Sequence, residues 1–428
     1  MFGFGKKKVE EEEEQPDVDP IQFKGPIGGK EPNLAAHGRL MEAGLIPAKD
    51  MMTDALLRRA GTIRLEPKGE QASITLLIDG MPYPGGRLGK QTASAVTQIL
   101  KLLAGLDIKQ RQTPQSGGLK AEFEDRPYEL LISTTPTPAG ERLTVRATDM
   151  KIKLESPEEL GFSEEFRKKV RERAVLPGLF LVAGPAASGT STTLYGCLRA
   201  VDAYMYSIYT VGPQEKTIFN VTPFPANEGE KLQTTLQRCV RAEANLIGIA
   251  QMKNTETLQA ALSVSETVSI MAEMSAKDTP SAVQQLIKWA GDPQVIADRV
   301  TTIVSQKLIR KLCEQCRQPF RPSSDFLKKA GLPASVTTLY RKPKPVEGVV
   351  PDACDKCGDL GFYGRAAMFE MLEFSDEMKQ LVATNPDPAK IRTQMRKEQM
   401  LTLQKDGLRL IAEGKTSLEE VQRVFKTP

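Results

Sequence analysis

The feature that most constrains the fold is the stretch over residues 181–196, LVAGPAASGTSTTLYG. An apolar run is followed by a loop bounded by glycines and by the start of a helix, which is the order of a phosphate-binding P-loop, G-x-x-x-x-G-K-[ST]. Gly184 and Gly189 stand at the glycine positions and Ser191 at the hydroxyl position. Thr190 stands where the motif has lysine. The stretch predicts a strand, loop and helix of a P-loop fold without the motif's charge.

Further apolar runs predict the sheet around this loop. LFLVAG, YSIYTVG, NLIGIAQM and TVSIMAEM are nearly continuous, and helical segments separate them. Strands of this kind are typical of a parallel sheet with helices on both faces. We therefore predict an α/β class with a mostly parallel sheet, preceded by a smaller α+β domain in which strand and helix patterns alternate over 61–150.

Composition excludes some functions and locations. No apolar run approaches the roughly 18 residues of a membrane span, and the N-terminus lacks the apolar segment of a signal peptide. We therefore expect a cytoplasmic protein. The net charge is +4, from 58 basic and 54 acidic residues, so bulk charge gives no reason to expect a nucleic-acid partner.

Four of the six cysteines form two C-x-x-C pairs that are separated by 37 residues. Two such pairs supply the four thiolates of a closed, tetrahedral, structural zinc site. Disulfides are the alternative, and a reducing compartment disfavours them. The predicted ligands are Cys313, Cys316, Cys354 and Cys357. The other two, Cys197 and Cys239, lie in apolar surroundings and are predicted to be core thiols.

Longer motifs, in their order along the chain, resemble those of a known family. They are LLAGLDIKQRQTPQSGG, PEELGFSEE, GPAASGTSTTLYGCLRAVD, DTPSAVQQLI, QKLIRKLCEQC, CDKCGDLGFYGRAAMFEML and GKTSLEEVQRV. From about Ile63 to Phe425 the chain resembles the motor ATPases of type II secretion and type IV pilus assembly. The resemblance implies a mobile N-terminal domain, a RecA-like ATPase domain, a zinc-bearing segment and, usually, a hexamer.

Patterning and resemblance together predict six regions. They are a disordered tail (1–33), an N-terminal α+β domain (34–150), a linker and helix (151–177), a RecA-like ATPase-type domain (178–310), a tetracysteine zinc segment (311–372) and a C-terminal helical region (373–428).

The candidate nucleotide-binding residues belong to the P-loop and the first helical turn after it. Backbone amides at a helix N-terminus still favour an anion. The missing lysine removes a charge-assisted bond of about 1.5–3 kcal/mol and a charge that stabilises phosphoryl transfer. ATP or ADP with Mg²⁺ is therefore expected to bind weakly. The candidate residues are Gly184, Ser188, Gly189, Thr190, Ser191 and Thr192.

The resemblance implies further departures from the family's catalytic boxes. Asn245 stands at the Walker B aspartate position and Gln251 at the catalytic glutamate position. An amide can orient a water but cannot act as its base. Val268 and Ser275 stand where the family has histidines, and His37 is the single histidine in the sequence.

The remaining family positions also lack their charges. The acidic box reads Gly212 and Pro213. The positions of the family's N-terminal arginines read Gln112, Gly118 and Leu131, although Arg111 and Arg146 remain nearby.

The sequence is compatible with three functions. The first is a non-hydrolysing relative of the motor that acts as a structural or regulatory partner, in a homo- or hetero-hexamer with motor paralogues, at an inner-membrane platform protein. The second is a nucleotide-binding sensor without turnover. The third is a slow but genuine ATPase that uses unrecognised residues. Nucleotide binding and phosphate release on one sample would discriminate among them.

Overall fold

The structure is a computed structural model that describes residues 18–28, 31–152, 156–212, 218, 221–344 and 354–426. The chain divides into two compact units, Met1–Lys153 and Leu154–Pro428. The first 17 positions of the predicted tail lie outside the described residues.

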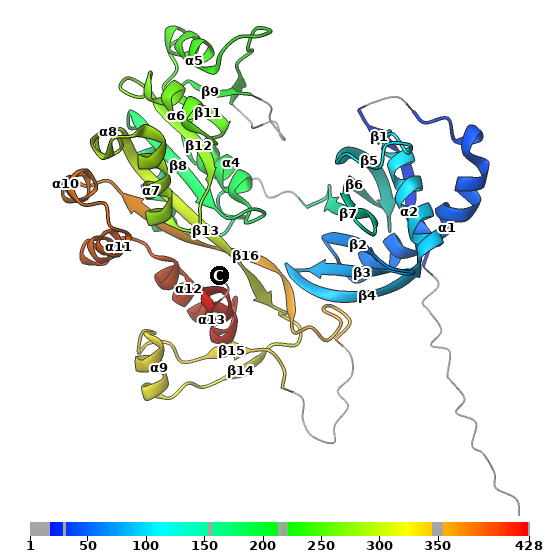
Figure 1. Ribbon diagram of the computed structural model, residues 1–428. Helices are drawn as coiled ribbons and strands as arrows, with labels where there is room; N and C mark the ends of the chain where they lie inside the picture. The colour runs from blue at the N-terminus through cyan, green and yellow to red at the C-terminus, as the bar shows by residue number, and fades with distance from the viewer. Residues whose placement is uncertain are drawn as a thin grey trace, which may run out of the picture. The chain divides into compact units, whose positions relative to one another are not determined.

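The first unit is an antiparallel sheet with helix α2 against it and helix α1 packed on α2 (Figure 1). Its strand order is β1-β5-β6-β7-β2-β3-β4. The elements are β1 Gln22–Ile27, η1 Leu34–His37, α1 Gly38–Leu57, β2 Thr62–Lys68, β3 Gln71–Ile78, β4 Met81–Gly89, α2 Lys90–Leu103, β5 Gln115–Phe123, β6 Arg126–Thr137 and β7 Gly140–Asp149.

Strand β1 corrects the prediction of a disordered tail over 1–33. It pairs antiparallel with β5 at the edge of the sheet. Ile21, directly before it, is fully buried, and its N–H donates to Thr53 Oγ1 at 3.0 Å. The charged run ahead of this strand, together with Gly25 and Pro26 inside it, gives the sequence no strand pattern, so the pairing with β5 could not be predicted from these residues.

The second unit is the predicted α/β domain, and its fold class is confirmed. The strand order is β10-β9-β11-β12-β8-β13-β16, with parallel pairs except β13 with β16. The elements are α3 Glu164–Ala174, β8 Gly178–Gly184, α4 Thr190–Ala200, β9 Ile208–Val211, β10 Thr222–Pro223, α5 Leu232–Arg241, β11 Leu246–Gln251, α6 Thr255–Leu262, β12 Ser269–Ser275, α7 Thr279–Ala290, α8 Pro293–Arg299, β13 Val300–Leu312 and β16 Phe362–Glu373.

Both faces of this sheet are buried, which explains the continuous apolar runs. In β8, Leu179 and Leu181 join the core under α5–α8, whereas Phe180 and Val182 join the core under α3 and α4. Figure 1 shows helices on the two sides. Cys197 and Cys239 are fully buried within these cores, as predicted. Burial raises the pKa of both thiols, that of Cys239 to about 11.

The core sheet extends past the predicted boundary at residue 310. Strand β16 pairs antiparallel with β13 from Thr302 to Leu312, so residues 362–372, which the sequence assigned to the zinc segment, belong to the sheet. A small hairpin-like pair and a helix lie in the insert before it, and four helices follow it. They are β14 Gln318–Phe320, α9 Ser324–Ala330, β15 Leu339–Arg341, α10 Asp376–Thr384, α11 Pro388–Lys397, α12 Leu403–Ala412 and α13 Leu418–Lys426. In the described part of the chain, no helix is long and apolar enough to cross a membrane.

Candidate nucleotide and metal sites

The P-loop lies between β8 and α4, at the carboxyl edge of the parallel strands. At Gly184 a side chain would collide with the Ser188 hydroxyl and with Thr190 Cγ2, so the tight loop requires glycine there. Gly189 has a φ of +88°, which also favours glycine. Ala187 adopts a φ of +61°. The two glycines that the sequence singled out therefore shape the loop.

The loop ends at the N-terminus of α4, which starts at Thr190. Gly189 precedes it without a side-chain cap. The first amides of such a helix need acceptors, and an anion can supply them. Thr190, Ser191 and Thr192 are half-buried in this first turn. The backbone therefore fits a phosphate, whereas Thr190 brings no charge to it.

Gln306, on β13, holds the P-loop through two hydrogen bonds. Its Nε2 donates to the backbone oxygen of Ser188 at 2.5 Å. Its Oε1 accepts from the hydroxyl of Thr193 on α4. Gln306 and Thr193 are both buried. The loop conformation is thus fixed by the protein itself.

The structure brings a carboxylate to the P-loop that sequence reasoning missed. Ser191 Oγ donates to Glu273 Oε2 at 2.8 Å. Glu273 lies on β12, directly beside the P-loop strand β8. Its register partner on the other side is Gln251 of β11. The available signal was the single acid in the otherwise apolar strand SIMAEMS, because an acid in a central strand needs a polar partner.

Two positions named by the resemblance lie at the opposite edge of the sheet. Asn245 precedes β11, and its Oδ1 accepts from the N–H of Ser207 at 2.8 Å. Six residues of strand, roughly 20 Å, separate it from Gln251. Val268 is a core residue just before β12. A carboxylate at 245 or a histidine at 268 would therefore not reach the P-loop, and the sequence interpretation of these two positions was wrong.

Gln251 and Ser275 do lie at the edge that holds the P-loop. Gln251 ends β11 and is exposed. Ser275 ends β12 and pairs in register with Gly184. Both side chains are neutral, so neither of them can act as a base.

The four predicted metal ligands come together. Their Sγ atoms all lie within 4.8 Å of one another. Sγ separations are 3.9 Å for Cys313 with Cys354 and 3.6 Å for Cys316 with Cys357. A tetrahedron with Zn–S bonds of about 2.3 Å has edges of about 3.8 Å, whereas a disulfide is about 2.05 Å long. All four thiols are free. This donor set and spacing fit a zinc ion.

Strand pairing explains how the two cysteine pairs meet across a 37-residue gap. Leu312 at the end of β13 pairs with Phe362 at the start of β16. The first cysteine pair follows one strand and the second precedes the other. The N–H of Cys313 also donates to the oxygen of Gly361 at 3.0 Å. The insert therefore leaves from one end of a hairpin without separating the ligands.

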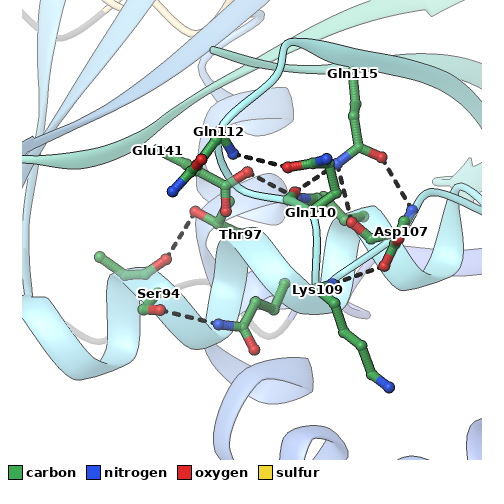
Figure 2. Close-up of polar contacts among 11 residues, drawn as sticks. Ser94, Thr97, Asp107, Lys109, Gln110, Gln112, Gln115 and Glu141 are labelled. Atoms are coloured by element: carbon green, nitrogen blue, oxygen red, sulfur yellow. Dashed lines mark hydrogen bonds and ion pairs between the residues drawn. The ribbon is translucent and has the colours of Figure 1, made fainter. Parts of the chain in front are cut away.

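In the first unit, the loop over 104–115 is held by an internal polar network. Lys101 is fully buried, and its Nζ donates to Glu141 and to the backbone oxygen of Gln110, both at 2.7 Å. Gln115 Nε2 donates to the backbone oxygens of Asp107 and Gln110 at 2.9 and 2.7 Å. Figure 2 shows Gln115, Gln110 and Asp107 converging inside the loop. This stretch carries one of the family-like motifs, and Arg111 at its tip is exposed.

Comparison with known proteins decides the family. The family of type II/IV secretion system proteins matches residues 41–423. The chain belongs to this family. Two proteins are similar to this chain. The type IV pilus assembly ATPase PilB of Thermus thermophilus is 28% identical to it over 378 residues, and the type II secretion system protein E of Dickeya dadantii is 29% identical to it over 383 residues. These alignments cover 87% and 88% of this chain.

The chain is shorter than these family members. It spans 42% of the Thermus protein, 66% of PilB of Myxococcus xanthus and 74% of the Dickeya protein. Solved structures share the fold. The ATPase DotB of Legionella pneumophila superposes with a TM-score of 0.53 at 12% identity, covering 90% of this chain and 96% of its own. The pilus retraction motor PilT with bound ADP gives 0.52 at 16%, covering 89% and 97%.

Proposed function

We propose that this chain is a non-hydrolysing member of the type II/IV secretion ATPase family. It serves as a structural or regulatory subunit, in a homo- or hetero-hexamer with motor paralogues, on the cytoplasmic side of an inner-membrane secretion or pilus platform. The relatives' descriptions as pilus assembly ATPases and type II secretion proteins support the setting. A platform protein of the membrane is the expected partner, and nucleic acid is not.

One observation carries the loss of hydrolysis. The carboxyl edge of the sheet presents Thr190 in place of the P-loop cation and Gln251 at the end of β11. Phosphoryl transfer depends on positioned charges acting together, because the protein does little covalent chemistry. A neutral hydroxyl and a neutral amide supply neither the charge nor a base. The tetracysteine group and both cores require none of these groups.

A second candidate, a nucleotide-binding sensor without turnover, is favoured by the Ser191–Glu273 hydrogen bond. That bond keeps a hydroxyl and a carboxylate side by side at the end of the P-loop. The third candidate, a slow ATPase, would need a base that faces an attacking water. Glu273 is the acid bonded to the loop, and its Oε2 already accepts from Ser191.

The first prediction is that the purified chain releases phosphate from ATP at background rates, measured with a sensitive phosphate assay. Ser191→Ala and Gln251→Ala samples are prepared identically. Turnover that persists in both variants identifies a contaminating ATPase. Turnover that either substitution abolishes contradicts the proposal, since it would place catalysis at this edge.

A further inference from the structure

The carboxylate of Glu273 has a place in this site that the family motifs do not give it. We propose that Glu273 and Ser191 together hold the Mg²⁺ of a bound nucleoside diphosphate or triphosphate, with the carboxylate supplied from β12 instead of β11. The inference rests on the second candidate function above, a P-loop that binds nucleotide without turning it over.

The hydrogen bond leaves Ser191 able to bind a cation. A serine hydroxyl has one proton and two acceptor lone pairs. The proton is donated to Glu273 Oε2 at 2.8 Å. The lone pairs of Ser191 therefore remain for a metal. In P-loop proteins this hydroxyl and a nearby carboxylate hold Mg²⁺, which needs few protein ligands because phosphates and waters complete its shell.

Strand register places Glu273 beside Gln251. Gln251 on β11 and Glu273 on β12 are register partners in adjacent parallel strands. Neighbouring strands are about 4.8 Å apart. Glu273 is also held by its backbone, whose oxygen accepts from the N–H of Met252 at 2.7 Å. Glu273 is thus an acid one strand closer to β8 than the position of Gln251.

A second observation points to a ligand inside the loop. The hydroxyl of Ser188 is buried, with the residue 6% exposed, and has no hydrogen-bond partner among the described residues. It lies within the loop, where it would collide with any side chain on Gly184. The neighbouring backbone is fixed by Gln306. A buried hydroxyl without a partner is costly, and a phosphate oxygen or a metal-bound water would satisfy it.

The charges at the loop determine how nucleotide binding should depend on Mg²⁺. Thr190 brings no cation, and Glu273 brings a negative charge. A free nucleotide phosphate is therefore repelled, whereas a phosphate that carries Mg²⁺ is attracted through the metal. Binding should depend on Mg²⁺ far more than in a P-loop with lysine.

The test measures ADP affinity of the full chain by calorimetry, in Mg²⁺ and in EDTA. ADP avoids any question of turnover. We expect Mg²⁺ to tighten binding by about tenfold or more, the size of one charge-assisted contact. Glu273→Gln should reduce that enhancement to near unity. Ser191→Ala should do the same, and the double variant should lose no more than either single variant. Glu256→Gln, on the exposed first turn of α6, is the matched control and should keep the wild-type enhancement.

Three results would overturn the inference. One is an unchanged Mg²⁺ enhancement in Glu273→Gln. Another is that Glu273→Gln binds ADP in EDTA as tightly as the wild type does in Mg²⁺, which would mean that the carboxylate only blocks the loop. The third is no ADP binding by the wild type at millimolar concentration. As a control for folding of the site, Ser191→Ala should bind ADP in EDTA with the same affinity as the wild type. ATP turnover, which would sink the proposed function, leaves each of these comparisons readable.

Discussion

At the scale of single residues, the loop differs from the G-x-x-x-x-G-K-[ST] motif mainly in charge. Its glycines hold the required backbone, and Gln306 fastens it. Thr190 removes a cation, and Glu273 adds an anion beside Ser191. The loop therefore keeps the backbone shape of a phosphate site, but its side chains bring a carboxylate and no cation. Restoring one charge should change binding and leave turnover absent.

Thr190→Lys is expected to tighten ADP binding in EDTA by about tenfold or more, because one charge-assisted bond is regained. It should not produce hydrolysis, since groups that act together in catalysis are grossly non-additive. Calorimetry and phosphate release on the same preparation measure both quantities. The single variant is compared with the double variant Thr190→Lys/Gln251→Glu, which also places an acid at the end of β11. Turnover by the single variant well above the wild-type rate would show that one residue accounts for the loss.

A second residue-scale prediction concerns the buried cation of the first unit. Lys101→Ala leaves Glu141 without its partner and frees the oxygen of Gln110, so we expect a loss of about 3–5 kcal/mol in unfolding free energy. Lys90→Ala, on the same helix, removes an exposed pair with Glu70 and should cost about 1 kcal/mol or less. Urea unfolding of both variants measures the difference. Equal costs would contradict a structural role for the buried pair.

At the scale of elements, one ion network ties the last helix to the core sheet. Glu420 on α13 is 2% exposed and accepts from Arg310 Nη2 on β13 at 2.7 Å and from Arg423 at 2.6 Å. Thr416 Oγ1 donates to the oxygen of Arg310 at 2.8 Å. Burial alone would raise the pKa of Glu420, but hydrogen bonds from Arg423 and Arg310 lower it to about 2. The ionised form is therefore part of the fold.

Acid should loosen this network in a defined range. The pKa of Glu420 in the folded chain lies below its ordinary value of 4.5, so its contribution to stability is present above that value and is lost as the pH falls toward 2. Glu420→Gln should cost about 3 kcal/mol at pH 7, and its cost should shrink between pH 5 and pH 2.5. Urea midpoints of variant and wild type across this range test it. A cost independent of pH would exclude the ionised carboxylate as the cause.

Elements also show what the sequence could and could not predict. The P-loop and the C-x-x-C pairs follow from local chemistry, because each is set by residues within a few positions. Glu273 could not be assigned this way, since its partner Ser191 is 82 positions away. Strand β1 depends on β5, and β16 depends on β13 across the long insert. Asn245 was misassigned from the family motif although it precedes the apolar run that Gln251 ends, an order that by itself places the two at opposite ends of a strand.

At the scale of the whole molecule, the two units have separate sheets and separate cores. Each sheet is completed by its own strands in the described residues. The tetracysteine group lies wholly in the second unit. Metal should therefore stabilise one unit and leave the other unchanged.

Calorimetry of the full chain is expected to show two unfolding transitions and, by metal analysis, one zinc per chain. A strong chelator should lower only the transition of the second unit, because zinc binding contributes directly to folding free energy. In the Cys354→Ser variant, the second unit should unfold at the lowered temperature even without chelator, and adding chelator should change that temperature little. A chelator effect on both transitions, or zinc absent from fresh reduced protein, would contradict this assignment.

The pairing of β13 with β16 has a mechanical consequence. Gln306, which donates to the P-loop backbone, and Cys313, the first of the four clustered cysteines, lie on one continuous segment, seven residues or roughly 23 Å apart. The strand beside it is hydrogen-bonded along that length and returns to the same cluster. The two-stranded ribbon is held at one end by the four clustered cysteines and at the other by the hydrogen bonds of Gln306, so it resists bending. A continuous hydrogen-bonded strand pair therefore links the P-loop to the tetracysteine group, and a force applied at one end would be carried along it to the other.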